Sequence, residues 1–191
     1  MSFITLSKVA ALLTPAAGKG TFGYDDARDA MCWVDEFGAV WYFGEQRKRL
    51  DADLSPFTST TLADVTGIYF PLLANTQYKF EFSFVFASAA TTTGIKLSLT
   101  CPASPTYLDA NVWIPRAADG AGAMWNGTIK ASGDAVVSDA VEEASVVYEA
   151  VVRGTIINGA TAGNLQLQAA TEVAASGITP KAGTSGRIWI P

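Results

Sequence analysis

The chain has 191 residues, enough for one sizeable domain with an appended segment. Apolar residues make up 49% and charged residues only 16%, well below the roughly 25% of an average soluble domain. The net charge is −5 and no concentrated basic face is evident, which argues against nucleic-acid binding. The chain has no histidine, which excludes Ser-His-Asp and Cys-His catalysis and histidine-ligated zinc within it.

The apolar residues are dispersed along the chain. No stretch approaches the ~20 consecutive apolar residues of a membrane helix, so we expect no membrane association. The N-terminal residues lack the pattern of a classical export signal. Cys32 and Cys101 are therefore expected to be free thiols, although a disulfide remains the alternative. The apolar excess should be buried in a core and between subunits.

Residues 1–60 are expected to form an N-terminal arm or adaptor, or an extra layer of the following domain. The segment Asp25–Val34 has apolar residues at helical spacing behind acidic residues, which predicts a short helix. Residues 39–43 are expected to form a strand. The basic run Arg47–Arg49 is flanked by acidic residues at Glu45 and Asp51.

Residues 61–191 are dominated by alternation of apolar and polar side chains. In Tyr78–Phe86 every second residue is aromatic, which predicts a strand over a core, and Ile95–Cys101 should pair with it as a hairpin. The other predicted strands are Leu62–Leu72, Tyr107–Ile114, Met124–Ala131, Val146–Arg153, Asn164–Ala169 and Arg187–Ile190. The pattern predicts an all-β fold, a jelly-roll-like antiparallel β-sandwich of about eight strands.

Carboxylates are the only groups that suggest catalysis or metal binding, and simpler roles are favoured for all of them. Helix capping or a solvated surface explains them better than a cation site or a glycosidase pair, which needs two carboxylates facing one cleft. We therefore predict no catalytic residue, metal or cofactor. The carboxylates considered are Asp25, Asp26, Asp29, Asp51, Asp53, Glu142, Glu143 and Glu149.

Tryptophans are the candidates for an interface or a ligand platform. Flat aromatic faces stack on sugar rings, and the same side chains anchor contacts between subunits. Packing in the core or between subunits is the favoured reading for them. The candidates are Trp33, Trp41, Trp113, Trp125 and Trp189.

A distinctive pattern lies between Thr61 and Pro102. It runs from Asp64-Val65-Thr66-Gly67 to the strand in Leu73–Phe82 and the loop Ala89–Ile95. This pattern resembles structural proteins of tailed bacteriophages, in which a turn leads into a Tyr-x-Phe-x-Phe strand and a Thr-Thr-Gly loop follows. Their turn often has Ala-Gly where this chain has Ala-Asn. The segment Lys181–Trp189 also looks like their last loop and strand, so the resemblance covers only part of the chain.

The resemblance implies a jelly-roll module, frequently trimeric, that serves as a head decoration, a head fibre or a tail-fibre tip, without catalytic residues. We expect a homo-oligomer, with a trimer favoured, in the virion after assembly in the host cytoplasm. Residues 1–60 would dock it on the major capsid protein or another virion protein. A decoration protein is favoured over a fibre tip because the chain is short and lacks fibrous repeats. A module that binds a carbohydrate or receptor, such as a host-surface glycan, and a hydrolase are the alternatives.

Overall fold

The computed structural model describes residues 16–25, 30–34, 40–43, 45–117 and 124–191. The chain divides into two compact units, one of residues 1–46 with Ile190 and one of residues 47–189 with Pro191. Every regular element in the described residues is a strand, which confirms the predicted all-β class.

The smaller unit contains a three-stranded antiparallel sheet of β1 (Thr21–Asp25), β2 (Ala30–Val34) and β3 (Val40–Phe43). The strand predicted at 39–43 is therefore confirmed, whereas the helix predicted over 25–34 is wrong. In β2, Cys32 and Val34 are buried and Met31 and Trp33 are exposed, a two-residue alternation typical of strands. A helix this short is marginal alone, while pairing on both sides satisfies the backbone of β2.

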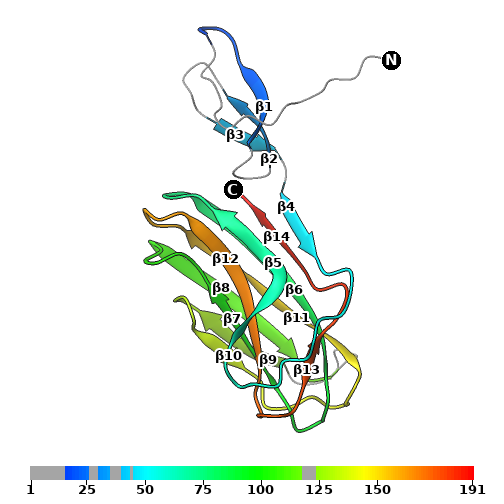
Figure 1. Ribbon diagram of the computed structural model, residues 1–191. Helices are drawn as coiled ribbons and strands as arrows, with labels where there is room; N and C mark the ends of the chain where they lie inside the picture. Colours follow the sequence, from blue (N-terminus) through cyan, green and yellow to red (C-terminus); the bar gives the residue numbers. More distant parts are fainter. Residues whose placement is uncertain (1–15, 26–29, 35–39, 44, 118–123) are drawn as a thin grey trace, which may run out of the picture. The chain divides into compact units, whose positions relative to one another are not determined.

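The larger unit is a sandwich of two antiparallel sheets (Figure 1). The smaller sheet has four strands in the order β10-β7-β12-β5, and the larger has the order β4-β14-β6-β11-β8-β9, with β13 also pairing with β6. The strands are β4 (Gln46–Arg49), β5 (Ala63–Leu72), β6 (Gln77–Ser88), β7 (Ile95–Thr100), β8 (Tyr107–Pro115), β9 (Met124–Ile129), β10 (Ala135–Val137), β11 (Val147–Ile157), β12 (Gly163–Thr171), β13 (Ile178–Pro180) and β14 (Ser185–Trp189).

The pairing from β5 to β12 defines a jelly roll. The first of these eight strands pairs with the last, β6 with β11, β7 with β10, and β8 with β9. The chain thus behaves as one long hairpin wrapped into two four-stranded sheets. β13 and β14 add strands beside β6, and β4 pairs with β14 at the edge of the larger sheet. The jelly-roll prediction is confirmed, although β10 was not among the predicted strands and β14, which was, lies outside the eight. The predicted hairpin of residues 78–86 with 95–101 is wrong. β6 pairs with β11, β13 and β14, and β7 pairs with β10 and β12, so the two strands lie in opposite sheets and their apolar sides meet across the core.

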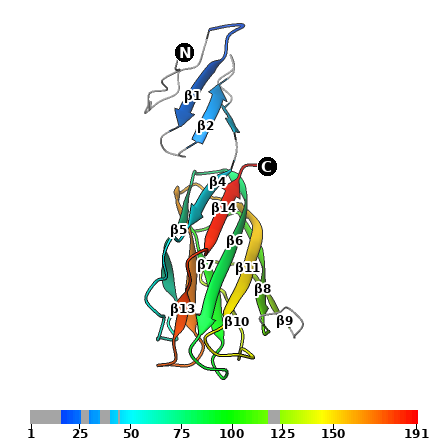
Figure 2. The same ribbon diagram turned by 90° about the vertical axis from the view of Figure 1, so that its right-hand side faces the viewer.

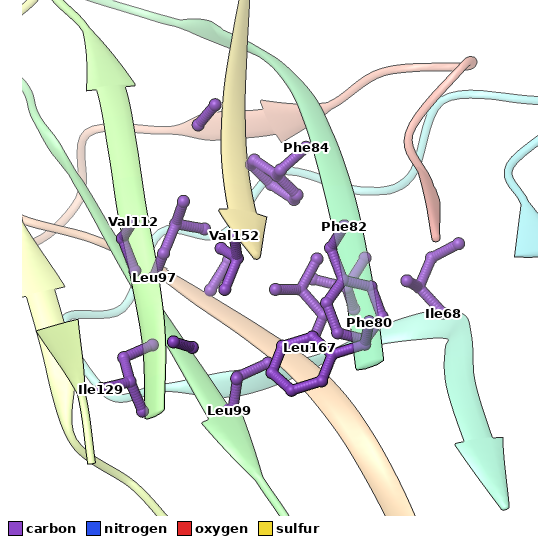
Figure 3. Packing of buried hydrophobic residues seen from close by; sticks show 14 of the residues in the cluster. Ile68, Phe80, Phe82, Phe84, Leu97, Leu99, Val112, Ile129, Val152 and Leu167 are labelled. Carbon is purple, nitrogen blue, oxygen red and sulfur yellow. The ribbon is translucent and has the colours of Figure 1, made fainter. Parts of the chain in front are cut away.

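The core fills the space between the two sheets (Figure 3). From the larger sheet, the alternate side chains of β6 from Tyr78 to Phe86 are all buried, as predicted. Leu97, Leu99 and Leu167 meet them from the smaller sheet and are fully buried. At about 25 cal/mol per Å² of apolar surface, burial of this aromatic layer is the main driving force for closing the sandwich.

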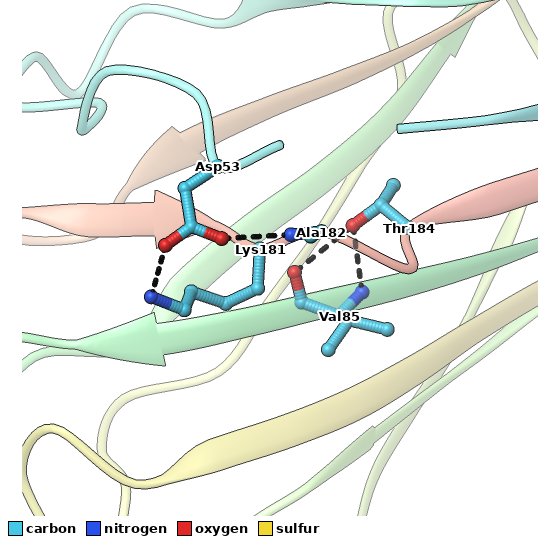
Figure 4. Close-up of polar contacts among 5 residues, drawn as sticks. All are labelled: Asp53, Val85, Lys181, Ala182 and Thr184. Carbon is cyan, nitrogen blue, oxygen red and sulfur yellow. Dashed lines mark hydrogen bonds and ion pairs between the residues drawn. The ribbon is translucent and has the colours of Figure 1, made fainter. Parts of the chain in front are cut away.

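Residues 47–60, predicted to belong to the N-terminal region, run along β13 and β14. Leu50 exchanges backbone hydrogen bonds with the segment 183–184, and Phe57 does so with Ile178. Asp53 forms an ion pair with Lys181 and accepts a 2.8 Å hydrogen bond from the Ala182 N–H (Figure 4). These contacts fasten the segment to the edge of the larger sheet.

A buried hydroxyl joins the same edge to β6. Thr184 Oγ1 accepts a hydrogen bond from the Val85 N–H and donates one to the Val85 carbonyl, both at 3.0 Å (Figure 4). Thr184 is fully buried, and it bonds the two backbone groups of Val85 between the points where β13 and β14 pair with β6. The hydroxyl thus takes the place of a backbone ladder bond.

Candidate functional site

The outer surfaces of the two sheets differ sharply in chemistry. On the smaller sheet, the outward positions carry only two charged side chains, Lys96 and Asp64. The other outward residues are uncharged and include threonine, serine, alanine, glutamine, asparagine, proline and valine, together with the exposed Tyr69. On the larger sheet, the outward positions of β6, β8, β11 and β14 alone carry Lys79, Glu81, Asp109, Glu149, Arg153 and Arg187. We call these surfaces the neutral face and the charged face.

Polar groups on the neutral face are largely satisfied by their own chain. The Gln166 amide donates to the carbonyls of Val65 and Ile68 at 3.0 and 3.1 Å, beside an irregularity in the pairing of β12 and β5. Gln168 donates to the Asp64 carboxylate at 2.8 Å. Lys96 Nζ donates to the Thr60 carbonyl at 3.2 Å. Covering this face would therefore leave few polar groups without a partner.

The strands β14, β6, β11 and β8 lie side by side (Figure 2), and their register places the charged side chains in rows that cross the strands. In one row Glu81 lies between two arginines: Arg187 Nη2 is 3.0 Å from Glu81 Oε1, and Arg153 Nε is 3.9 Å from Glu81 Oε2. In the next row Trp189 is in register with Lys79, and Thr155 separates Lys79 from Asp109. The Arg187 guanidinium lies 5.4 Å from the centre of the Trp189 ring and steadies it.

A depression of about 370 Å³ is set into the charged face. Trp113, Trp189 and Tyr107 line it together with Lys79 and Arg153. The lining also includes Asp109, Asn111, Gly154 and Thr155. It therefore combines flat aromatic rings with donors, an acceptor carboxylate and two cations.

Tyr107 and Asp109 form a hydrogen-bonded pair at one end of the depression. The Tyr107 hydroxyl donates to Asp109 Oδ2 at 3.2 Å. This bond to a carboxylate favours the protonated phenol and raises the pKa of Tyr107 above its ordinary value. Tyr107 therefore remains a donor, and Asp109 retains its second oxygen as an acceptor.

A second depression of about 400 Å³ adjoins the row of Glu81 on the β4 side. Its cationic lining consists of Arg187 and the run Arg47–Arg49, against the single carboxylate of Glu81. Within that run, Arg49 is paired with Asp51 at 2.7 Å and Lys48 lies 5.8 Å from the centre of the Tyr69 ring. The charged face thus carries a local excess of positive charge on a chain of net charge −5.

The candidate tryptophans are distributed over both units. Trp113 and Trp189 line the same depression, while Trp125 turns inward from β9 and packs against the core. In the smaller unit, Trp33 is 39% exposed and its ring lies against Gly20. Trp41 is in register with Trp33, and its side chain lies outside the described residues. Alternation could have placed Trp113 outward and Trp125 inward, but no sequence signal links Trp113 to Trp189.

Three of the candidate carboxylates have structural contacts, while Glu142 and Glu143 are exposed and, within the described residues, only their backbone groups are hydrogen-bonded. Asp51 binds Arg49, Asp53 binds Lys181, and Glu149 accepts a 2.5 Å hydrogen bond from the Ser83 hydroxyl. The side chains of Asp25, Asp26 and Asp29 lie outside the described residues. In the part of the chain that is described, no three acidic or cysteine side chains gather as metal ligands, and no helix could cross a membrane.

Both cysteines are free thiols. Cys32 is buried and donates to the Gly23 carbonyl at 3.6 Å. Cys101 is half-buried against the core, and this burial raises its pKa above the ordinary value.

No family model matches this chain. No curated protein matches it either. Among solved structures, it is similar to infectious bursal disease virus of the Gt strain, with 9% identity, 78% of this chain and 39% of that chain covered, and a TM-score of 0.20. It is also similar to the VP2 subviral particle of infectious bursal disease virus, with 10% identity, coverage of 78% and 42%, and a TM-score of 0.20. The chain spans about two fifths of the length of these proteins. Because these TM-scores are low, the jelly-roll assignment rests on the strand pairing of this chain and not on the similarity to these structures.

Proposed function

We propose that this chain is a non-enzymatic structural protein of a tailed-bacteriophage virion, most specifically a capsid decoration protein. The observation that carries the proposal is the wrapped pairing of β5 to β12, because jelly rolls recur in viral capsid and lectin domains. The step from fold to function is an analogy, supported by the resemblance of Asp64–Ile95 to phage structural proteins.

Self-association belongs to this proposal, with the neutral face as the contact surface. Interface cores are depleted of charged residues, and the outward positions of this sheet carry only Lys96 and Asp64. Its edge strand β10 also presents Val137, which is 43% exposed. Three copies packed through this face would leave the charged faces toward solvent.

Attachment to the particle is assigned to residues 1–60. The three-stranded sheet of the smaller unit is too small to bury a large core of its own, which suits a segment that docks on a partner. The major capsid protein or another virion protein is the proposed partner, with assembly in the host cytoplasm.

A receptor-binding module, as at a tail-fibre tip, is the second candidate. The depression with Trp113 and Trp189 favours it, since decoration alone requires no ligand site. Both candidates place the chain on the outside of a virus particle.

Light scattering on the full chain tests the self-association. We expect a mass of three times the 20.1 kDa chain. Val137→Glu on the neutral face should reduce it to that of a monomer, because it would bury an unpaired charge. The matched control is Val147→Glu, which places the same charge at a 51% exposed valine on the larger sheet and should leave the trimer intact. A monomeric wild-type chain would overturn self-association, and a Val137→Glu trimer would overturn the choice of face.

A further inference from the structure

The depression on the charged face has the reach of an oligosaccharide site. Trp113 lies three strands and two rows away from Trp189, which corresponds to roughly 20 Å between their Cα atoms at ordinary strand geometry. Tyr107 marks a third corner, six residues before Trp113 on the same strand. Aromatic rings this far apart in one depression suit a ligand of several linked rings rather than a single small molecule.

Several polar side chains between these rings have no hydrogen-bond partner in the described part of the chain. They are the Lys79 ammonium, the Asn111 amide and the Thr155 hydroxyl, and all three line the depression. Asp109 adds an acceptor oxygen beyond the one that receives the Tyr107 hydroxyl. Donors and acceptors mixed between flat apolar surfaces match the alternation of hydroxyl groups and C–H faces on a sugar.

The charges of the face indicate the kind of sugar. Lys79 and Arg153 outnumber Asp109 within the depression. The adjoining depression adds Arg47, Lys48 and Arg187 against Glu81, while its fourth cation, Arg49, is paired with Asp51. A net positive surface on an acidic chain attracts an anionic ligand. We propose that this depression binds an oligosaccharide that carries carboxylate groups, with Trp113 and Trp189 stacking on its rings and Lys79 pairing with a carboxylate.

Single-stranded nucleic acid also combines rings with negative charge, but the lining fits it less well. Asp109 lines the depression with one carboxylate oxygen that is not used by Tyr107, and this oxygen requires a hydrogen-bond donor on the ligand. The same carboxylate accepts hydrogen bonds from sugar hydroxyl groups, which a phosphodiester cannot donate. The site uses the sheet opposite the neutral face, so it does not depend on self-association.

A panel of defined acidic and neutral glycans, probed with the full chain, tests the proposal, and a dT15 oligonucleotide serves as the rival ligand. We expect binding to glycans with uronic or sialic acids, and a loss of about tenfold in Trp113→Ala and in Trp189→Ala. Lys79→Gln should weaken acidic glycans selectively and reduce the salt dependence. Val173→Ser, at an exposed apolar residue in the loop after β12, should bind as the wild type does.

Each contrary result has a defined meaning. Absence of binding to every glycan, or retention of binding in both tryptophan variants, would overturn the site. If neutral glycans bound as tightly as acidic ones, the requirement for carboxylate groups would be overturned. If dT15 bound and no glycan did, the ligand would be a single-stranded nucleic acid and not an oligosaccharide. Light scattering on the same samples reports self-association separately, so that failure of one proposal is not mistaken for failure of the other.

Discussion

Gly186 makes room for the aromatic layer of the core, which leads to a quantitative prediction. It lies in β14 opposite Phe82 of β6. A methyl group added at this position would lie 2.6 Å from Phe82 Cδ1 and 2.9 Å from Phe70 Cε2. Carbon atoms in contact are normally about 3.5–4.0 Å apart, so at least one ring would have to move by about 1 Å.

We expect Gly186→Ala to destabilise the sandwich by about 1–2 kcal/mol. Overpacking of a core costs about 1–3 kcal/mol. Loss of glycine's unfolded-state freedom returns about 0.5–1 kcal/mol. The φ angle of Gly186 is not positive, so the penalty should come from the rings and not from the backbone. Urea denaturation followed by circular dichroism measures the change in the free energy of unfolding.

A double-mutant cycle identifies the cause. Phe82→Leu removes the ring that the new methyl group would strike, so Gly186→Ala should cost less in that background, with a coupling of about 1 kcal/mol. Gly133→Ala is the control, because its φ of +88° penalises alanine while no atom lies within 4 Å of the added carbon. Strictly additive effects of Gly186→Ala and Phe82→Leu would refute the steric explanation.

Three further predictions concern polar groups. Thr184→Val should lower the free energy of unfolding by about 1–3 kcal/mol, because it leaves the Val85 N–H without a partner, whereas the Val85 carbonyl keeps its hydrogen bond from the Lys181 N–H. Thr184→Ser should retain most of this stability, and equal losses in urea denaturation would contradict the explanation. Hydrogen bonds from Lys181 and Ala182 lower the pKa of Asp53 below its ordinary value of 3.8. The contribution of Asp53 to the free energy of unfolding is therefore complete above pH 3.8 and is lost as the pH falls further. Asp53→Asn should make the free energy of unfolding depend less on pH in this acidic range, as urea denaturation at several pH values would show. Burial raises the pKa of Cys101, so iodoacetamide at pH 8 should alkylate it more slowly in the folded chain than in urea, as mass spectrometry would detect.

Strands that cover the core could be predicted from sequence, and strands held only by neighbours could not. β6 was predictable because its aromatic residues recur at every second position and all face the core. β4 reads Gln-Arg-Lys-Arg and has no apolar alternation, so its strand conformation comes from its place beside β14. β10 and β13 are three residues long, too short for a periodic signal. The prediction of a helix in residues 25–34 was wrong because it used only the spacing of apolar residues within that segment. This spacing contains no information about the pairing of β2 with β1 and β3.

For the candidate site, the sequence predicts only which side chains of each single strand face outward, and not which strands are neighbours. Alternation places Trp113 on the outer side of β8 and Trp189 on the outer side of β14. The strand order β14-β6-β11-β8 then brings both rings onto one surface, with Lys79 and Arg153 between them. Strand order is a property of the wrapped hairpin as a whole, and no local spacing encodes it.

The chain has few charged residues, 16% of the total, and those of the two sheets are concentrated on one face of the sandwich, which leaves the other face nearly uncharged. Burying the row of Arg187, Glu81 and Arg153 in a subunit contact would remove three partly hydrated charges from water, which their mutual attraction does not reliably repay. Covering the neutral face removes few charges, and Gln166 and Gln168 would keep their internal hydrogen bonds. In the proposed assembly, the cost of desolvation would therefore favour packing of the smaller sheets together, with the larger sheets facing outward.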